Sequence, residues 1–528
     1  MTVAALLPAH WDIRLTDINV ADLTDEDWNW ADVICTGGMI PQQPGILAII
    51  DRAQADEKYV VVGGPDPTSQ PEVYERADAR VLGEGEITVP MWLDAWRRGE
   101  PLGLFETADR PDVTLSPTPR FDLINFRDYL HVGIQISRGC PFNCEFCDII
   151  ELYGRVPRSK SIEQVLTELD RIADLGHRGW VDVSDDNFIG NKKFVKKLLV
   201  ALEEWCRKRN YPFYFTTEAS MNLADDDELL DMMRRVDFRY VFMGIESPDP
   251  DLLATTQKRM NSLKPIVQRI HHVYEHGIAI TAGFIMGFDG EKPGTADALI
   301  DCIEETGINI AMVGLLVALP NTQLTRRLMS EGRMIDGNHQ LLPPSNDRYR
   351  LESSDTITVE NTTGGLNFVT TRDRVDVYDD YRRIISTIYD PGVFMRRVMR
   401  TTRMLRPERR QKPSLGELRR NAVAFLRIAW WMTRHAEVRW HYWNNTIRTF
   451  WMGMAKFEFA QSMMAPYMHL SKQAARVRHE MQLGINFAQH KATYPRSTAD
   501  LPAGRQSQDL SLPVLEVLGA GRDCSEPA

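Results

Sequence analysis

The stretch "ISRGCPFNCEFCDI", residues 136–149, places three cysteines within eight residues: Cys140, Cys144 and Cys147. A structural zinc site needs four ligands and usually takes them as two pairs. Iron–sulfur clusters are held by cysteine thiolates, normally four, so three thiolates leave one iron open to another ligand. The spacing therefore predicts an iron–sulfur cluster with an open iron. A zinc site completed by a remote ligand is the alternative.

From residue 133 onward the chain alternates between strand and helix patterns. Helical stretches such as 161–175, with Ser161 as the expected N-cap, and 191–207 separate six predicted strands. The strands are Gly133–Ser137, Trp180–Ser184, Phe213–Thr217, Tyr240–Ile245, Ile278–Met286 and Ala311–Leu319. Six such units predict a partial or complete TIM-like (β/α)6 barrel, with its chemistry at the carboxyl ends of the strands. Polar residues follow those ends: Asp185, Asp186 and Asn187 after the second strand, Glu218 after the third, and Glu246 and Ser247 after the fourth.

Residues 1–100 show a second series of short strands and helices. The expected strands are Ile13–Val20, Asp32–Met39, Tyr59–Gly64 and Ala79–Gly83. This alternation predicts an α/β domain with a doubly wound, Rossmann-like parallel sheet. Small-residue loops follow the last three strands and contain Gly37, Gly63, Gly64, Glu84 and Gly85. Glycines at such positions allow a ligand to approach the backbone, although singly each one also suits an ordinary turn.

We therefore expect five parts in the chain. They are an N-terminal domain (1–100), a proline-containing linker (101–132), the barrel (133–334), a helical C-terminal extension (335–490) and a disordered tail (491–528). Within the extension, residues 396–439 carry 13 Lys and Arg against three acidic residues, and tryptophans such as Trp440 and Trp451 follow. This region resembles an interfacial amphipathic segment, which predicts peripheral contact with a membrane surface. A solvated basic face beside a helical core is the alternative.

The composition excludes several classes of protein. A net charge of −11 over 528 residues argues against nucleic-acid binding by the molecule as a whole. Seven cysteines, an odd number and partly clustered, are typical of a reducing compartment rather than of a disulfide scaffold. The first residues lack the basic start of a signal peptide, and no apolar run reaches the ~20 residues of a membrane span. The expected location is cytoplasmic.

The cysteine stretch resembles the cluster motif of the radical S-adenosylmethionine (SAM) superfamily, C-x-x-x-C-x-Φ-C, with Phe146 as the aromatic residue. Later segments look like strand-end motifs of the cobalamin-dependent branch, which includes the hopanoid C-2 methylases. They are "VSDDNFIGN" (183–191), "TTEASMN" (216–222), "MGIESPD" (243–249), "GFIMGFD" (283–289) and "ALPNT" (318–322). "VVGGPDPTSQPE" and "LGEGE" in the first 100 residues are similar to the cobalamin-binding domain of that branch.

The resemblance implies a mechanism and three cofactors: a 4Fe–4S cluster, SAM and cobalamin. In that branch SAM binds the open iron, and an electron passing through the cluster cleaves it to methionine and a 5′-deoxyadenosyl radical. The radical removes hydrogen from an unactivated carbon, and methylcobalamin then delivers a methyl group. Such a carbon has no acidic proton, so a cofactor must carry the chemistry. The implied substrate is an apolar small molecule or lipid such as an isoprenoid, and the implied electron donor is a flavodoxin or ferredoxin.

The resemblance also assigns residues. Cys140, Cys144 and Cys147 would hold the cluster, and Phe146 would pack near the adenine. Glu218, Glu246 and Ser247, with Gly244 beside them, would contact the ribose or the aminoacyl end of SAM. Asp185, Asp186 and Asn187 would face SAM or the substrate, or would cap the following helix. Gly37, Gly63, Gly64, Glu84 and Gly85 would line the corrin site. No catalytic residue can be assigned.

Two features depart from the family pattern. The chain opens on what is expected to be the first crossover helix, TVAALLP, whereas the initial strand of the family precedes that helix. We therefore expect a translation start upstream, adding roughly 40–60 residues, the length of one βα unit with its loops. A defective cobalamin domain is the alternative. The pattern D-x-H-x-x-G, which supplies a histidine to cobalt in many cobalamin domains, is absent from the sequence. Many methylases of this branch also lack it, so its absence does not exclude the corrin.

Two other functions stay open at this stage. The same cofactors can serve oxidation or ring closure without methyl transfer. A non-catalytic sensor that carries a cluster or a corrin is a third possibility, but a sensor needs no SAM site. The strand-end motifs beyond the cysteines therefore favour an enzyme, and among enzymes a C-methyltransferase.

Overall fold

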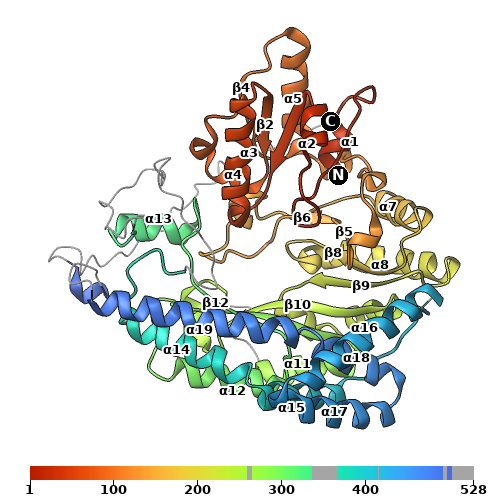
Figure 1. The fold of residues 1–528 in the computed structure, drawn as a ribbon, viewed down its shortest axis with the longest axis vertical. Helices are drawn as coiled ribbons and strands as arrows, with labels where there is room; N and C mark the ends of the chain where they lie inside the picture. Colours follow the sequence, from red (N-terminus) through yellow and green to blue (C-terminus); the bar gives the residue numbers. More distant parts are fainter. Residues whose placement is uncertain (259–264, 336–364, 414, 491–495, 502–528) are drawn as a thin grey trace, which may run out of the picture.

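The computed structural model describes residues 1–258, 265–335, 365–413, 415–490 and 496–501. A small sheet near the N-terminus lies at the top of Figure 1, a larger sheet lies below it, and C-terminal helices cover the far side of the larger sheet. Residues 336–364, at the start of the expected C-terminal extension, and most of the tail expected at 491–528 lie outside the described residues.

The N-terminal sheet has four parallel strands in the order β1-β2-β3-β4. They are β1 (Val33–Gly37), β2 (Tyr59–Gly63), β3 (Ala79–Val81) and β4 (Gly103–Phe105). The helices are α1 (Thr2–Leu6), α2 (Asp25–Trp30), α3 (Gln43–Ala55), α4 (Pro65–Ser69) and α5 (Gly85–Arg98). One apolar cluster joins α3 to the sheet through Ile46 and Ile50, and another joins α5 and α1 to it through Trp92 and Leu6. The sheet is therefore covered on both faces, as a doubly wound fold requires.

Two details of this domain differ from the sequence prediction. Residues Ile13–Val20 form no strand, although their apolar residues alternate. Ile18 and Val20 are exposed, and without a neighbouring strand the alternation has no sheet to join. Conversely, β4 lies inside the expected linker and pairs with β3, Phe105 opposite Val81. Its three residues are too few to produce a periodic signal.

The larger sheet confirms the predicted partial barrel. Its six strands are parallel, in the order β12-β11-β10-β9-β8-β5. They are β5 (Val132–Ile134), β8 (Gly179–Val183), β9 (Phe213–Glu218), β10 (Phe238–Glu246), β11 (Ala279–Met286) and β12 (Ala311–Leu315). The helices are α6 (Ile149–Leu152), α7 (Ile162–Asp174), α8 (Lys192–Lys208), α9 (Asp227–Arg235), α10 (Pro250–Thr255), α11 (Ile266–Glu275), α12 (Thr295–Thr306) and α13 (Gln323–Ser330). Among the described strands, β5 and β12 are the two edges, so the barrel is open.

Local sequence signals explain where these helices begin and which face they bury. Ser161 caps α7, because its hydroxyl accepts a hydrogen bond from the Gln164 backbone and the Gln164 side-chain oxygen accepts one from the Ser161 backbone. Val165, Leu169 and Ile172 follow at helical spacing and are fully buried against the sheet. The predicted cap and the predicted helix are both confirmed.

The C-terminal extension is helical, as predicted, and it closes one edge of the barrel. Its helices are α14 (Arg374–Ile388), α15 (Pro391–Met404), α16 (Leu415–Arg434), α17 (Ala436–Trp451), α18 (Met454–Met464) and α19 (Tyr467–His490). Two buried tyrosine hydroxyls donate to carbonyls of the edge strand β12: Tyr381 to Val313 at 3.0 Å and Tyr389 to Ala311 at 2.7 Å. Exposed strand edges recruit other chains, so this cover protects the edge. Among the described helices, none combines the length and the hydropathy that crossing a membrane requires.

We predict that Tyr381→Phe and Tyr389→Phe each lower the free energy of unfolding by about 1–3 kcal/mol, because each leaves a buried carbonyl of β12 unpaired. Urea unfolding followed by circular dichroism measures the change. Tyr211→Phe is the matched control, since the Tyr211 hydroxyl has no hydrogen-bond partner within the described residues. Losses no larger than that of the control would show that the hydroxyls do not hold the edge.

Candidate functional site

The three cysteines lie on one loop, residues 139–148, whose base is pinned by a two-stranded ribbon. Strands β6 (Ser137–Arg138) and β7 (Arg158–Ser159) pair antiparallel at that base. Gly139 has φ of +93°, and a Cβ there would lie 2.9 Å from the Gly154 carbonyl oxygen, so this turn requires glycine. The three thiols are free, and Cys144 is buried. We call residues 139–148 the cysteine loop.

Three consecutive side chains after β8 fasten the cysteine loop to the barrel. Asp185 is buried and accepts hydrogen bonds from the backbone of Ile136 at 2.7 Å and of Ser137 at 2.9 Å, and from the Ser137 hydroxyl at 2.7 Å. Asp186 accepts from the Gly139 backbone at 2.8 Å. Asn187 donates to the Cys140 sulfur at 3.8 Å. The Asp185 carboxylate therefore holds the start of the loop in place, and Asn187 is the member of the triplet that contacts a cysteine.

Two glutamates of the N-terminal domain clamp the base of the same loop. Arg138 donates to Glu84 at 2.8 Å and to Glu86 at 2.7 Å, and Arg158 donates to Glu84 at 2.6 Å. The two carboxylates are almost fully buried. Burial acts to raise the pKa of Glu86, but hydrogen bonds from Arg138 and Ser116 outweigh this effect and lower that pKa to about 2. We call Glu84, Glu86, Arg138 and Arg158 the domain clamp.

The far side of the cysteine loop is held by α13. Arg327 of α13 donates to Glu145 of the loop at 3.0 Å and to Asp289 at 2.9 Å. The Leu324 backbone donates to the Glu145 carbonyl at 2.8 Å. The loop is thus fixed on both sides by residues of other elements, which preorganises the three thiols.

The barrel rim next to the cysteines combines an aromatic pair with a buried ion pair. The Phe146 ring meets Phe288 edge-on, with centroids 5.5 Å apart. The Lys258 ammonium pairs with Glu246 and lies 5.9 Å from the Phe146 ring. Glu246 is buried with φ of +66°, and a Cβ on Gly244 would come within 2.7 Å of the Lys258 nitrogen. The Ser247 hydroxyl accepts from the Asp249 backbone at 3.2 Å, which turns the chain away from β10.

Glu218 is the unpaired acid of this rim. It ends β9 at the open mouth of the barrel, and its carboxylate accepts no hydrogen bond from the described residues. Its side chain is exposed at the end of the strand, but desolvation by the surrounding protein, with the nearby charges of Asp182 and Asp186, raises its pKa to about 7. A carboxylate without a partner at the end of a barrel strand is a candidate ligand for a bound polar group.

The chemistry of the cysteine loop fits a metal cluster. Burial raises the pKa of all three thiols, that of Cys147 to about 12. Only the thiolate binds iron, so bound metal would have to offset this cost. The charge of Lys258 acts in the same direction at Cys140 and Cys144, because it lowers their pKa values against the effect of burial. Three thiols beside one cation, with no disulfide among them, suit a cluster that carries an open iron.

A cleft of about 440 Å³ lies between the N-terminal sheet and the barrel. Thr68, Gly83, Glu84 and Thr107 line it from the carboxyl ends of β2, β3 and β4, and Asp148, Leu152 and Asn321 line it from α6 and the approach to α13. Gly83 has φ of +82°, and a Cβ there would meet only the Thr107 carbonyl oxygen, at 3.9 Å. Its backbone is therefore open to a ligand in the cleft.

The glycines proposed for the N-terminal site serve different purposes in the structure. Gly37 and Gly63 lie opposite each other in β1 and β2, and Gly64, with φ of +102°, packs on Gly38, so these three permit a close approach of two strand ends. Gly85 starts α5 and faces Val89 and Leu6. Glu84 does line the cleft, but both of its oxygens already accept from the domain clamp arginines.

The structure thus gathers the barrel candidates in one place and adds residues that the sequence analysis missed. Lys258 follows α10 with no motif of its own, and it reaches the cysteines only through the fold. Arg138 stands two residues before Cys140, yet its partners are 52 and 54 residues away in the chain. The available sequence signal for this contact was a charged residue directly before the cysteine loop.

Comparison with known proteins agrees with this geometry. Residues 134–303 match the radical SAM superfamily, and residues 322–483 match a domain of unknown function (DUF4070). An uncharacterised methyltransferase from Synechocystis sp. is 38% identical over 91% of this chain and 87% of that protein. Hopanoid C-2 methylase from Rhodopseudomonas palustris is 32% identical over 85% of this chain and 82% of that protein. The chain therefore belongs to the radical SAM superfamily, within the family of methyltransferases that includes hopanoid C-2 methylase.

Two solved structures share the fold. OxsB, a cobalamin-dependent radical SAM enzyme solved with aqua-cobalamin and SAM, aligns with a TM-score of 0.54 and 16% identity over 87% of this chain and 73% of its own. TsrM from Kitasatospora setae, a radical SAM methyltransferase solved with cobalamin and a [4Fe-4S] cluster, aligns with a TM-score of 0.54 and 15% identity over 85% of this chain and 88% of its own.

We predict that Arg138→Gln lowers the free energy of unfolding by about 3–5 kcal/mol, because it leaves buried carboxylates without their partner. The exposed pair of Arg97 with Asp94 supplies the control, and Arg97→Gln should change stability by less than about 1 kcal/mol. The pKa of Glu86 is lowered in the folded state, so its contribution is present above the unfolded pKa and is lost as pH falls toward 2. The gap between wild type and Arg138→Gln should therefore narrow in acid, and equal urea midpoints at pH 7 would refute the clamp.

We predict the opposite pH dependence for Glu218→Gln. The pKa of Glu218 is raised in the folded state, so the folded protein binds more protons than the unfolded chain between the ordinary value and about 7. Stability therefore falls as pH rises through this window, and Glu218→Gln removes that loss. Thermal unfolding without SAM should show a higher midpoint for the variant at pH 8 and no difference at pH 4. The exposed Glu437→Gln is the control, and a variant midpoint below wild type at pH 8 would contradict the prediction.

Proposed function

We propose that this protein methylates an unactivated carbon of an apolar small molecule or lipid, with a 4Fe–4S cluster, SAM and cobalamin as cofactors. The observation that carries the proposal is the placement of a ligand-sized cleft beside the cysteine loop. One wall of the cleft is formed by the strand ends of the Rossmann-like sheet, where such sheets bind ligands, and the other by α6, which begins directly after the cysteine loop. A methyl carrier in the cleft and a cluster on the loop would lie on neighbouring elements.

The residues present suit each cofactor. Cys140, Cys144 and Cys147 would hold the cluster, and Phe146, Glu218, Gly244, Glu246 and Ser247 would contact SAM. Thr68, Gly83 and Asn321 would contact the corrin in the cleft. When bound, the cluster and SAM would supply a carbon-centred radical, and the corrin would supply the methyl group. This chain's own side chains contribute binding, orientation and exclusion of water.

Several side chains would hold and shield the site before the reaction begins. The domain clamp fixes the distance between the cleft and the cysteine loop, because it consists of two buried carboxylates and two arginines from the two sides. Lys258 offsets the negative charge of the thiolates. Phe146 and Phe288 cover the adjacent rim with hydrocarbon, which keeps water from a reactive radical.

The partners follow from this chemistry. We propose an electron donor such as a flavodoxin or a ferredoxin, a cytoplasmic location, and contact with the surface of a membrane, in which an apolar substrate would dissolve. Oxidation or cyclisation of the substrate without methyl transfer is the second candidate, since it uses the same cofactors.

We predict that the anaerobically reconstituted protein, with a chemical reductant, SAM and cobalamin, releases both 5′-deoxyadenosine and S-adenosylhomocysteine when given a lipid extract of its source. S-adenosylhomocysteine requires methyl transfer, so its absence alongside 5′-deoxyadenosine would favour the second candidate. Replacing Cys140, Cys144 and Cys147 by alanine should remove the visible iron–sulfur absorbance and both products. Replacing Cys206, a buried cysteine outside the loop, by serine is the control and should leave that absorbance in place. Zinc bound in place of iron would refute the proposal.

A further inference from the structure

Helix α17 buries several polar residues and exposes several large apolar ones. Asn445 and Thr449 are buried, whereas Trp440, Ile447 and Trp451 are 75%, 58% and 82% exposed. Positions 440, 443, 447 and 451 recur at intervals of three and four, so the exposed side chains form one stripe along the helix. A surface helix of a monomeric globular protein normally shows the reverse pattern. The stripe is therefore a face built to be covered.

Buried hydrogen bonds fix this orientation. The Asn445 amide donates to the Met395 carbonyl at 2.7 Å, and the Gln461 amide donates to the Thr446 hydroxyl at 3.1 Å. The Thr449 hydroxyl donates to the Asn445 carbonyl at 2.8 Å. Rotating α17 to bury the tryptophans would break the bonds to Met395 and from Gln461, and each broken bond would leave a buried polar group unpaired. The Thr449 bond lies within the helix and satisfies that hydroxyl where it is buried.

Helix α16 extends the apolar surface. Leu415, Leu418, Leu426 and Trp430 lie on one side of it and are 86%, 50%, 64% and 62% exposed. The Trp443 indole donates to the Thr433 hydroxyl at 3.0 Å and joins the two helices. We call the exposed apolar residues of both helices the α16–α17 face: Leu415, Leu418, Leu426, Trp430, Trp440, Trp443, Ile447, Phe450 and Trp451.

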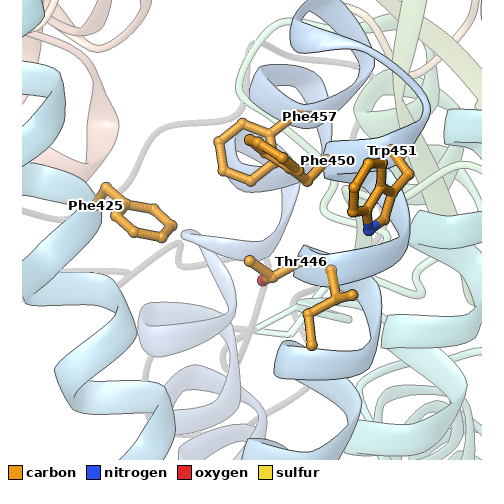
Figure 2. A pocket seen from close by; sticks show the side chains of 6 residues that line it. Phe425, Thr446, Phe450, Trp451 and Phe457 are labelled. Atoms are coloured by element: carbon orange, nitrogen blue, oxygen red, sulfur yellow. The ribbon is translucent and has the colours of Figure 1, made fainter.

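A pocket of about 390 Å³ opens beside this face. Figure 2 shows its lining, with Phe425 of α16 on one side and Phe450, Trp451 and Phe457 opposite. Thr446 provides the polar side-chain atom nearest the centre of the view, and the other labelled lining side chains present rings. A space lined by hydrocarbon and aromatic rings accepts an acyl chain better than a polar ligand.

The charges beside the face are predominantly positive. Residues 415–451 contain six arginines and two glutamates, in a chain whose net charge is −11. Arg427, Arg439 and Arg448 have no carboxylate partner within the described residues. The Arg434 guanidinium lies over the Trp430 ring at 4.6 Å, and both side chains are exposed. Arginines flanking a tryptophan-rich apolar stripe are typical of a helix that lies in the interface of an anionic bilayer.

We propose that the α16–α17 face docks on an anionic lipid bilayer and that a lipid acyl chain occupies the pocket. A second copy of the chain fits the observations less well, because an isologous contact would set the same unpaired arginines against each other. The biological purpose of the contact rests on the proposed function, since an apolar substrate would be taken from the bilayer. Helix α18 links the face to the barrel: Phe457 lines the pocket, and Phe459 stacks on Tyr240 of β10 with centroids 6.4 Å apart.

The test is flotation of the full-length protein with vesicles of phosphatidylcholine alone or mixed with phosphatidylglycerol. We expect binding to the mixed vesicles at low salt, with a blue shift of tryptophan emission, and at least about tenfold weaker binding to phosphatidylcholine or at high salt. The double variant Trp440→Gln/Trp451→Gln should bind at least about tenfold more weakly, and Arg439→Gln/Arg448→Gln should lose the preference for anionic lipid. Leu102→Gln/Leu130→Gln, two exposed apolar residues outside the face, is the matched control and should bind like wild type.

Three outcomes would overturn the inference. The first is that wild type ignores anionic vesicles at low salt. The second is that the tryptophan double variant binds as tightly as wild type. The third is a dimer in size-exclusion chromatography that dissociates in that variant, which would assign the face to a second copy. Cluster absorbance and S-adenosylhomocysteine formation, measured on the same proteins without vesicles, test the proposed function separately, so vesicle binding without product, or product without vesicle binding, distinguishes the two failures.

Discussion

The turn after β8 is the constraint on which the site depends. Asp185 gives its carboxylate to the backbone and hydroxyl at the start of the cysteine loop, Asp186 holds Gly139, and Asn187 reaches the Cys140 sulfur. A loop that presents three thiols to one cluster needs surrounding residues to hold it in a single conformation. Three side chains in sequence, set at the end of a buried strand, replace the regular hydrogen bonding that such a loop lacks.

From this turn the support spreads outward in two directions. The domain clamp joins the base of the cysteine loop to the N-terminal sheet, and Arg327 joins the other side to α13 and Asp289. The barrel edge is in turn closed by α14 through Tyr381 and Tyr389. The C-terminal extension is therefore part of the barrel's structure and not an appendage, and its outer helices are free to carry a different surface.

Sequence reasoning reached the parts of this arrangement that are local. Cysteine spacing, the apolar runs of the barrel strands and the Ser161 cap all depend on residues close together in the chain, and they were predicted. Ile13–Val20 was predicted wrongly because alternation alone does not provide a partner strand, and β4 was missed because three residues give no period. Lys258 and the partners of Arg138 are long-range contacts, and a single sequence contains no signal that pairs them. The α16–α17 face was only suggested by composition, because exposure cannot be read from a helix whose polar residues face inward.

Glu84 belongs to two places at once, since it lines the cleft and also binds both arginines at the base of the cysteine loop. An occupant of the cleft that moves this carboxylate would also disturb the two arginines that hold the base of the cysteine loop. Thermodynamic linkage makes the effect reciprocal, so a change at the loop alters the affinity of the cleft by the same factor. The cleft and the cysteine loop would then bind their occupants as a coupled pair, through a single shared side chain.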